Sequence, residues 1–341
     1  MMRLPYFQFH SPREVRAAAE LLAHAAPGEA MLIAGGTDIL PNMKRRQQVP
    51  KSLISLRQIA ELRTISNGTG YTIGSGVTLT DLVRHPGIRS AYVGLWQAAA
   101  QVATPHLRNM GTIGGNLCLD TRCNYYDQNY EWRKSIDFCM KKDGDTCWVA
   151  TSSPKCLAVS STDTAPALIA LGASVTLVSS EGARRIPLSQ MYRNDGIEYL
   201  TRRPSEILSA VHLPNLQGWR STYWKLRRRG SFDFPVLSVA AAVKIAADGA
   251  VEDARIVLGA VASRPFEVPD AAASLVGVSL TDETIERAAT LAAQPARPMD
   301  NTDFSLHWRK RVARDFVGYA LRELRGDDMR AVRVRIARQL L

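Results

Sequence analysis

Short apolar runs that end in glycine or polar turns fill the first part of the chain. The run MLIA at 31–34 predicts a short buried strand, and it leads directly into the glycine pair of GGTDIL. Before it, SPREVRAAAELLAHA predicts a helix that begins at Pro12, because Ser11 and Glu14 have the spacing of a capping box. This helix is expected to end near 27–28, where a proline and a glycine follow. The first glycine pair therefore follows a buried strand.

The next segments predict a hairpin, two helices and a second glycine-rich loop. ELRTISNGTGYTIGSG at 61–76 indicates two strands joined by an Asn-Gly turn, a pair that favours tight hairpins. A short helix from Thr80 follows, and then a longer apolar helix that ends before Pro105. HLRNMGTIGGNL at 106–117 is the second glycine-rich loop.

The later part of the chain changes from alternating elements to strands followed by helices. A helix from Thr162 or Asp163 leads into the strand SVTLVS. Further strands are predicted at 206–214, 221–228, 235–245 and 252–263, and helices at 282–293 and 304–325. This order indicates an α+β fold, and we place a domain boundary near 214–220, PNLQGWR.

Length and hydropathy are those of an ordinary globular protein. The 341 residues suggest roughly two domains, and 46% hydrophobic residues suffice for buried cores. No apolar run reaches the roughly 18 residues that a membrane span needs. The N-terminal MMRLPYFQFHSPREV lacks the pattern of a secretory signal, so we expect a cytoplasmic protein, unless a partner's signal exports it.

The net charge of +11 raises the question of nucleic-acid binding. Basic runs occur at 44–46, at 225–230 and between 309 and 338, but none is interleaved with aromatic residues or belongs to a known nucleic-acid-binding pattern. Solvated basic faces, or surfaces that meet acidic partner subunits, are therefore favoured over a nucleic-acid interface.

The two glycine-rich loops are candidate anion sites. AGGTD and GTIGGN match neither the Rossmann nor the Walker A pattern. Their glycines allow backbone N–H groups to surround an anion, and Thr37, Thr112 and Asn116 add side-chain donors. Together the loops could hold a pyrophosphate from two sides, although each alone is more typical of a tight turn with a helix cap.

All five cysteines lie between residues 118 and 156. In an intracellular protein such a cluster indicates a metal or catalytic site rather than disulfides. Cys123, Cys139, Cys147 and Cys156 are separated by 15, 7 and 8 residues, a wider spacing than that of a zinc knuckle. Cys118, in the apolar NLCLD, is expected to be a small buried hydrophobe. An iron–sulfur cluster, a zinc ion and unligated thiols all remain open at this point.

Four segments, taken in order, resemble motifs of the flavoprotein subunit of the xanthine dehydrogenase or molybdenum hydroxylase family. They are LIAGGTDILPNMK, ATPHLRNMGTIGGNLCLDTRC, SSTDTAPALIALGA and KLRRRGSFDFPVLSVAAAV. The resemblance extends from about residue 3 to 325 and implies a two-subdomain FAD-binding fold of the PCMH type, followed by an α+β C-terminal domain of the CO dehydrogenase flavoprotein type. The implied FAD-binding domain is 1–216, with lobes 1–58 and 59–216. The second domain is 217–330, and 331–341 is a tail.

The resemblance also implies where FAD binds. It assigns the pyrophosphate to the two glycine-rich loops, composed of Met31, Leu32, Ile33, Ala34, Gly35, Gly36 and Thr37, and of Thr112, Ile113, Gly114, Gly115 and Asn116. It further implies flavin-nucleotide contacts at Asp163 and Lys225, and more peripheral contacts at Val102 and Asn124. Two other interpretations stay open: Asp163 as the N-cap of a helix, and Lys225 as a solvated strand end.

The cysteine segment, about 121–158, is an insertion that most members of this family lack. It is most similar to the β subunit of 4-hydroxybenzoyl-CoA reductase, which carries a [4Fe–4S] cluster besides FAD. The resemblance places the cluster on Cys123, Cys139, Cys147 and Cys156 and leaves Cys118 without a role.

The implied activity is electron transfer, with no catalytic side chain in this chain. The expected partners are a large molybdopterin-binding subunit and a small subunit with two [2Fe–2S] clusters, in a heterotrimer that can dimerise, and a ferredoxin or another electron carrier. One alternative is the flavoprotein subunit of an aldehyde, xanthine or N-heterocycle dehydrogenase, in which electrons flow outward. Alternatives from other classes are a zinc-stabilised nucleic-acid-binding module and a structural subunit without flavin.

Overall fold

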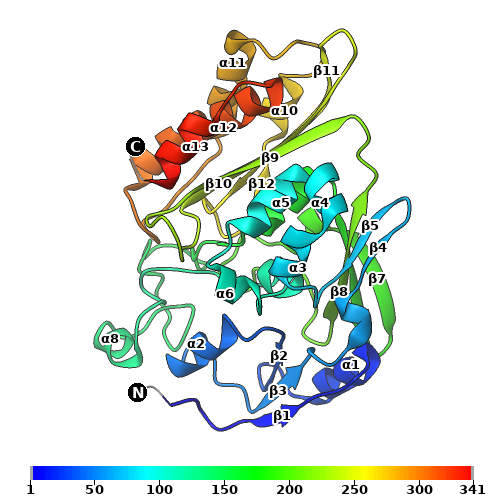
Figure 1. The fold of residues 1–341 in the computed structure, drawn as a ribbon. Coiled ribbons are helices and arrows are strands. Elements are labelled where there is room, and N and C mark those ends of the chain that lie inside the picture. The colour runs from blue at the N-terminus through cyan, green and yellow to red at the C-terminus, as the bar shows by residue number, and fades with distance from the viewer. Residues whose placement is uncertain (1–2, 339–341) are drawn as a thin grey trace.

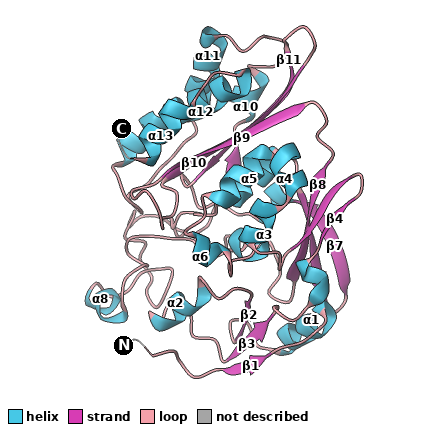
Figure 2. Ribbon diagram, in the orientation of Figure 1, coloured by secondary structure: helices cyan, strands magenta, loops and turns pink. Residues whose placement is uncertain are grey.

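The computed structural model describes residues 3–338, and these residues form three β-sheets with helices between and around them (Figures 1 and 2). The strand orders are β1-β3-β2, β4-β5-β8-β6-β7 and β12-β11-β10-β9. One parallel sheet, two antiparallel sheets and helices segregated from them agree with the predicted α+β class. No helix of residues 3–338 is long and apolar enough to cross a membrane.

The first sheet and its helices form the blue lobe at the bottom of Figure 1. Its parallel strands are β1 (Gln8–His10), β2 (Ala30–Ile33) and β3 (Ser52–Ser55), and its helices are α1 (Val15–His24) and α2 (Ile39–Lys44). The predicted strand MLIA is therefore confirmed as β2, and the glycine pair connects it to α2.

Helix α1 begins at Val15 and not at the predicted Pro12. Its N-cap residue Glu14 makes no side-chain cap. Instead, the Val15 N–H donates to Glu61 Oε1 at 3.2 Å. A carboxylate that is distant in sequence accepts from the free N–H at the start of the helix, so the prediction from the local capping-box pattern was wrong.

The five-stranded sheet is antiparallel and belongs to the second lobe. Its strands are β4 (Ile65–Asn67), β5 (Gly70–Gly74), β6 (Ser174–Ser179), β7 (Gly182–Pro187) and β8 (Ile207–Pro214). The helices of this lobe are α3 (Leu79–Arg84), α4 (Pro86–Ala91), α5 (Val93–Ala100), α6 (Pro105–Arg108), α7 (Ile113–Leu117) and α9 (Thr164–Ala170), with 3₁₀ turns at Ala60–Arg63 and Leu188–Met191. The predicted hairpin is confirmed, whereas the long apolar helix is divided into α4 and α5 at Tyr92.

The four-stranded sheet forms the C-terminal part of the chain. Its strands are β9 (Trp219–Leu226), β10 (Leu237–Ile245), β11 (Val251–Gly259) and β12 (Phe266–Glu267). Its helices are α10 (Pro269–Ala273), α11 (Asp282–Ala293), α12 (Leu306–Arg325) and α13 (Arg330–Ala337). Figure 1 shows α12 on one face of the sheet and α5 on the other.

Strand β10 explains why SVAAAV is apolar at every position but the first. Val239, Ala241 and Val243 belong to the core under α12, while Ala240 and Ala242 belong to the core of the second lobe. A strand buried on both faces needs a continuous apolar run and not an alternating one. The two predicted domains thus share one packed boundary.

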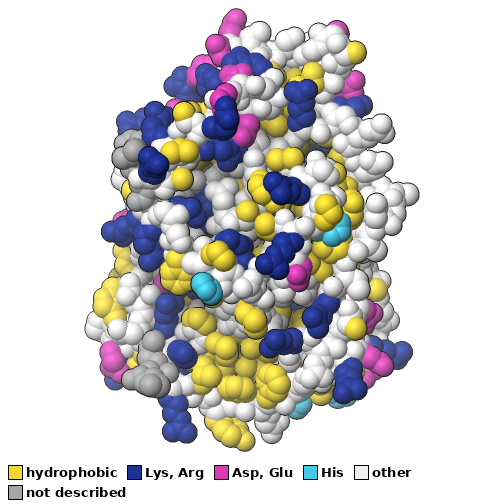
Figure 3. All heavy atoms as spheres, in the orientation of Figure 1, with side chains coloured by type: hydrophobic (Ala, Val, Ile, Leu, Met, Phe, Trp, Pro, Cys, Tyr) yellow, Lys and Arg dark blue, Asp and Glu magenta, His cyan; other side chains and the backbone are white. Residues whose placement is uncertain are grey.

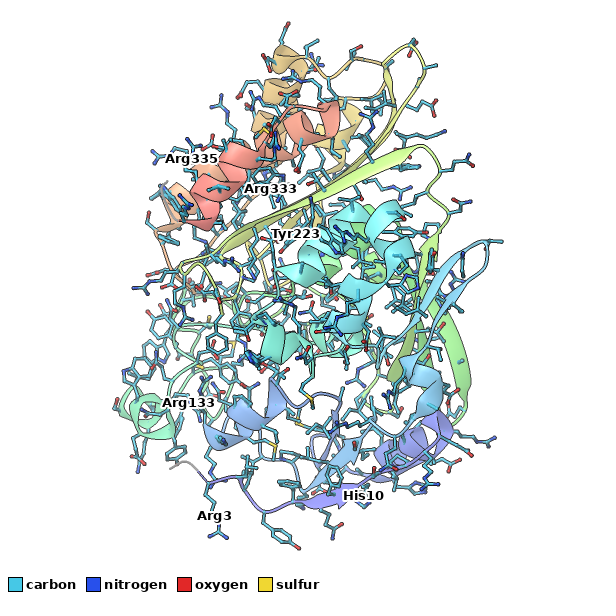
Figure 4. All side chains as sticks on the ribbon, in the orientation of Figure 1. Arg3, His10, Arg133, Tyr223, Arg333 and Arg335 are labelled. Atoms are coloured by element: carbon cyan, nitrogen blue, oxygen red, sulfur yellow. The ribbon has the colours of Figure 1, made fainter. Side chains whose placement is uncertain are left out.

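The segment that we expected to be a tail begins with helix α13. Arg333, on α13 in Figure 4, donates to Glu323 Oε2 at 2.6 Å and lies 4.0 Å from the ring centre of Trp224. Residues 330–337 are therefore docked on α12 and β9, while 339–341 lie outside the described residues.

The cysteine segment contains one short helix, α8 (Tyr130–Ser135), and otherwise consists of loops. It lies beside α2 at the lower left of Figure 1. Arg133 on α8 is fully buried and donates to the carbonyl oxygens of Arg45 and Arg46 at 3.1 and 3.3 Å (Figure 4). The segment is thus attached to the first lobe through a buried guanidinium group.

Candidate functional site

The two glycine-rich loops lie in direct contact. A Cβ atom on Gly35 would stand 1.9 Å from the carbonyl oxygen of Met110 and 3.0 Å from the nitrogen of Gly111. Only glycine allows the two backbones to approach so closely. The sequence placed these loops far apart along the chain, and the fold brings them together.

The first loop presents free backbone donors. Among the described residues, no acceptor takes the N–H groups of Gly35, Gly36 or Thr37. Gly36 has a φ of +73°, which L-residues other than glycine rarely adopt. Successive N–H groups around a left-handed glycine form a concavity that binds anions.

The second loop differs, because its donors are used within the chain. Ile113 N–H donates to Val77 O at 3.0 Å, and Gly114 N–H donates to Ser75 O at 2.9 Å. Thr112 caps α7 by accepting from the Gly115 N–H at 3.1 Å. This loop therefore supports the first one and caps a helix in the present conformation.

Asn116 connects the second loop to the start of α9. Its Oδ1 accepts from Thr162 Oγ1 at 2.9 Å and from the hydroxyl and N–H of Thr164 at 2.6 and 3.1 Å. All three residues are buried. Asn116 consequently fixes the position of the neighbouring Asp163.

Asp163 and Lys225 form a fully buried ion pair. Lys225 Nζ donates to Asp163 Oδ2 at 3.0 Å, and Tyr223, labelled on β9 in Figure 4, donates its hydroxyl to Asp163 Oδ1 at 2.7 Å. Lys225 also donates to the carbonyl oxygens of Gln101 and Asp233 at 3.1 and 2.9 Å. Burial raises the pKa of Asp163 and lowers the pKa of Lys225, and the opposite charge of each partner opposes the shift of the other.

This arrangement excludes the two alternative interpretations of these residues, and their contacts with the flavin nucleotide stay a prediction. Asp163 stands at the N-cap position of α9 but makes no side-chain cap, so its carboxylate is not a helix cap. Lys225 has no exposed side-chain surface, so it is not a solvated strand end. Together they join α9 to β9 behind the glycine loops.

Val102 and Asn124 lie near the borders of this region. The Val102 carbonyl accepts from Arg108 Nη1 at 2.7 Å, and its side chain packs on the core of the second lobe. The exposed Asn124 donates its N–H to the carbonyl oxygen of Asn301 at 2.9 Å. Asn124 therefore connects the cysteine segment to the C-terminal part.

Sequence reasoning missed Arg122, which joins three parts of the chain. Its buried guanidinium group donates through Nη2 to Asp38, directly after the first glycine loop, and through Nη1 to Asn42 and Asp127 at 3.1 and 3.2 Å. It also lies 5.0 Å from the ring centre of Phe234. In the sequence, the one hint of a role for this arginine was its position directly before Cys123, and that position does not predict these contacts.

Four cysteines line one small pocket of the cysteine segment, which we call the cysteine pocket. They are Cys123, Cys139, Cys147 and Cys156, each 5–7% exposed. Cys118 lies elsewhere and packs against the core of the second lobe. Burial raises the pKa of Cys123 to about 12 and that of Cys156 to about 11, so these thiols are protonated near neutral pH.

Within residues 3–338, no three His, Cys, Asp or Glu side chains are arranged to hold a single metal ion. The four thiols thus share a pocket without converging on one point. This arrangement gives no support to the zinc interpretation.

An apolar surface adjoins the first glycine loop. Leu4, Phe7, Met31, Ile33 and Leu40 are partly buried and pack around the small core of the first lobe. Figure 3 shows hydrophobic side chains gathered on this face over the first lobe. A flat apolar group held near the loop would find complementary surface there.

Comparison with known proteins agrees with this architecture. Residues 5–216 match the family described as FAD binding domain in molybdopterin dehydrogenase, and residues 221–324 match the CO dehydrogenase flavoprotein C-terminal domain. The chain is 34% identical to the FAD-binding subunit of aldehyde oxidoreductase from Escherichia coli, over 81% of this chain and 86% of that protein. It is 29% identical to the FAD-subunit of nicotinate dehydrogenase from Eubacterium barkeri, over 82% and 83%.

A solved structure has the same fold. Carbon monoxide dehydrogenase from Hydrogenophaga pseudoflava, in a form that lacks the Mo-pyranopterin moiety, superposes with a TM-score of 0.78 and 26% identity. The match covers 95% of this chain and 98% of that one. The chain is therefore an FAD-binding flavoprotein subunit of the xanthine dehydrogenase and CO dehydrogenase family, an oxidoreductase subunit of a molybdenum hydroxylase-type dehydrogenase.

Proposed function

We propose that this chain carries electrons through FAD and a [4Fe–4S] cluster in a complex similar to 4-hydroxybenzoyl-CoA reductase. The observation that supports this beyond the family is the cysteine pocket, which four buried thiols line within the FAD-binding domain. Arg122 connects the two regions, because it donates to Asp38, directly after the first glycine loop, and precedes Cys123.

The first glycine loop is the proposed pyrophosphate site. Gly35, Gly36 and Thr37 offer N–H groups that have no acceptor among the described residues, as a diphosphate requires. The backbone of the second loop packs directly against the first loop at Gly35. The buried pair of Asp163 and Lys225 holds α9 against β9. Bound FAD would supply conversion between two-electron and one-electron transfer.

The cysteine pocket fits a [4Fe–4S] cluster better than a single ion. Such a cluster takes one thiolate on each of four irons, so its ligands surround a volume and need not meet at a point. The pocket provides four thiols within an apolar and aromatic wall that includes Tyr126 and Trp148. The proposed ligands are Cys123, Cys139, Cys147 and Cys156.

The proposed complex contains a large molybdopterin-binding subunit and a small subunit with two [2Fe–2S] clusters. Electrons would enter from a ferredoxin-like carrier in the cytoplasm and leave toward molybdenum. A second candidate is an aldehyde or N-heterocycle dehydrogenase with outward flow, which the relatives named for aldehyde and nicotinate oxidation favour. Assays of the purified complex with an aromatic acyl-CoA and with aldehydes distinguish these two functions.

An absorption spectrum and an iron analysis of the anaerobically purified chain test the proposal. We expect flavin bands, a broad shoulder that bleaches on reduction, and about four irons per chain. Flavin without iron would refute the cluster. A colourless protein with zinc and salt-sensitive DNA affinity would support the nucleic-acid-binding alternative, and a colourless protein without metal would indicate a structural subunit.

Replacing Cys147 by serine should remove most of the iron and leave FAD bound, because the cysteine pocket and the first glycine loop are built from different segments. Iron and flavin are measured per chain on the same preparation. Cys118→Ser is the matched control and should keep both, since Cys118 lies outside the pocket. Loss of FAD along with iron would show that the cysteine segment is needed to form the flavin site.

A further inference from the structure

One basic side chain lines the cysteine pocket among the described residues. Lys141 follows Cys139 by two positions, and its side chain is 7% exposed. The other lining residues are the four cysteines and neutral side chains, such as Tyr125, Met140 and Val149. Burying an ammonium group is unfavourable, because it loses its hydration, unless partners compensate for the loss.

All three N–H groups of the Lys141 ammonium donate to acceptors. Nζ donates to Asp120 Oδ1 at 2.8 Å, to Thr121 Oγ1 at 2.7 Å and to the Gly196 carbonyl at 2.6 Å. The rings of Tyr126 and Tyr199 also lie 4.9 and 5.5 Å from Nζ. These contacts hold the charge in one place and exclude water from it.

The neutralising carboxylate is outside the lining of the cysteine pocket. Asp120 pairs with Lys141 but does not line the cysteine pocket. Its Oδ2 is engaged by the Tyr126 hydroxyl at 3.1 Å and by Gln48 Nε2 at 3.3 Å. The pair is therefore a fixed dipole, and of its two members only the positive one lines the pocket with the sulfur atoms.

The same group organises the backbone around Cys156. The Gly196 carbonyl that accepts from Lys141 belongs to a residue whose N–H donates to the Cys156 carbonyl at 2.9 Å. A Cβ atom on Gly196 would stand 2.6 Å from Cys156 Sγ. The positive charge also lowers the pKa of Cys156, although burial has the larger and opposite effect.

We propose that Lys141 sets the reduction potential of the [4Fe–4S] cluster in the cysteine pocket, an inference that rests on the function proposed above. Reduction adds one electron to the cluster, supplied by reduced flavin or a low-potential one-electron carrier, and neither makes nor breaks a bond. The added negative charge is stabilised by a nearby fixed positive charge, and more strongly at a site shielded from water. Lys141 therefore raises the potential.

The test is a potentiometric titration of the cluster signal by electron paramagnetic resonance in the purified full-length chain, with dithionite as reductant. Lys141→Met keeps the length and removes the charge. At a fixed ambient potential near the wild-type midpoint, its ratio of reduced to oxidised cluster should fall about tenfold, equivalent to about 59 mV for one electron. Lys141→Arg should change the ratio by less than about twofold, because it keeps the charge.

Two further variants separate charge from structure. Lys142→Met removes the neighbouring, more exposed ammonium and should leave the ratio unchanged. Lys141→Met combined with Asp120→Asn removes both ends of the dipole, so the fall should be smaller than in Lys141→Met alone. The double variant leaves no unpaired carboxylate in the interior. It is therefore the variant to titrate if Lys141→Met alone does not assemble the cluster.

The outcomes are distinguishable from failure of the proposed function. A wild-type chain without iron would refute that function before any titration. An intact cluster in Lys141→Met with an unchanged midpoint would overturn the role of Lys141. Loss of the cluster from both neutral variants, with retention in Lys141→Arg, would make Lys141 a structural support of the pocket and would overturn it as well.

Discussion

Replacing Lys225 by methionine should lower the free energy of unfolding by about 3–5 kcal/mol. The change keeps the apolar stem but leaves the Asp163 carboxylate buried without its ammonium partner. Tyr223 remains as a donor to this carboxylate, yet a hydroxyl does not neutralise its charge. Urea denaturation of the purified chain, followed by tryptophan fluorescence, measures the loss.

Lys51→Met is the matched control. Lys51 also pairs with a carboxylate, Glu29, but its side chain is 76% exposed. An exposed pair contributes at most about 1 kcal/mol, so the control should stay close to the wild type. Equal losses in both variants would contradict the importance of burial.

The loss in Lys225→Met should depend on pH. Burial raises the pKa of Asp163, and removing the ammonium raises it further. The folded state then binds a proton that the unfolded state releases, so stability decreases as pH rises through the range between the two pKa values. The deficit should accordingly shrink as the pH is lowered toward the ordinary pKa of an aspartate, and adding Asp163→Asn should recover part of it at neutral pH.

The elements with a clear hydrophobic period could be predicted from the sequence. The strand SVTLVS and the helix at 282–293 were predicted with the bounds that the structure has. Helix α1 was misplaced, because its N-terminus depends on Glu61 and not on a neighbouring residue. The break at Tyr92 was missed for a related reason: an apolar run shows that a segment is buried but not where a helix turns.

The candidate site, too, could be predicted from the sequence only in part. Glycine pairs and cysteines could be found by their composition and spacing. The sequence did not show that the backbone N–H groups of the first loop lack acceptors while those of the second loop have them, because both loops have similar glycine-rich sequences. The roles of Arg122 and Lys141 could not be predicted, because a basic residue in a polar segment resembles any solvated one. Their roles come from tertiary contacts with Asp38 and Asp120.

Replacing Gly35 by alanine should weaken FAD binding by about 10- to 100-fold, equivalent to about 1.4–2.8 kcal/mol. The new Cβ would stand 1.9 Å from the Met110 carbonyl oxygen and 2.4 Å from its carbon. Because these are backbone atoms, no rotamer change relieves the clash, and one of the two loops must move. Since Gly35 and its neighbours supply the proposed pyrophosphate donors, that movement separates them from their ligand. Titration of the flavin-free chain with FAD, followed by flavin fluorescence, measures the affinity.

Gly68→Ala is the control for this prediction, because a Cβ atom there meets nothing within 4 Å and the residue has no positive φ. It should bind FAD as the wild type does. Unchanged affinity in Gly35→Ala would place the pyrophosphate away from the contact between the loops. Weakened binding with an unchanged unfolding midpoint would instead localise the effect to the loops. The expected magnitude follows from the overlap of the new methyl group with the backbone of the second loop, which the two loops can relieve only by moving apart.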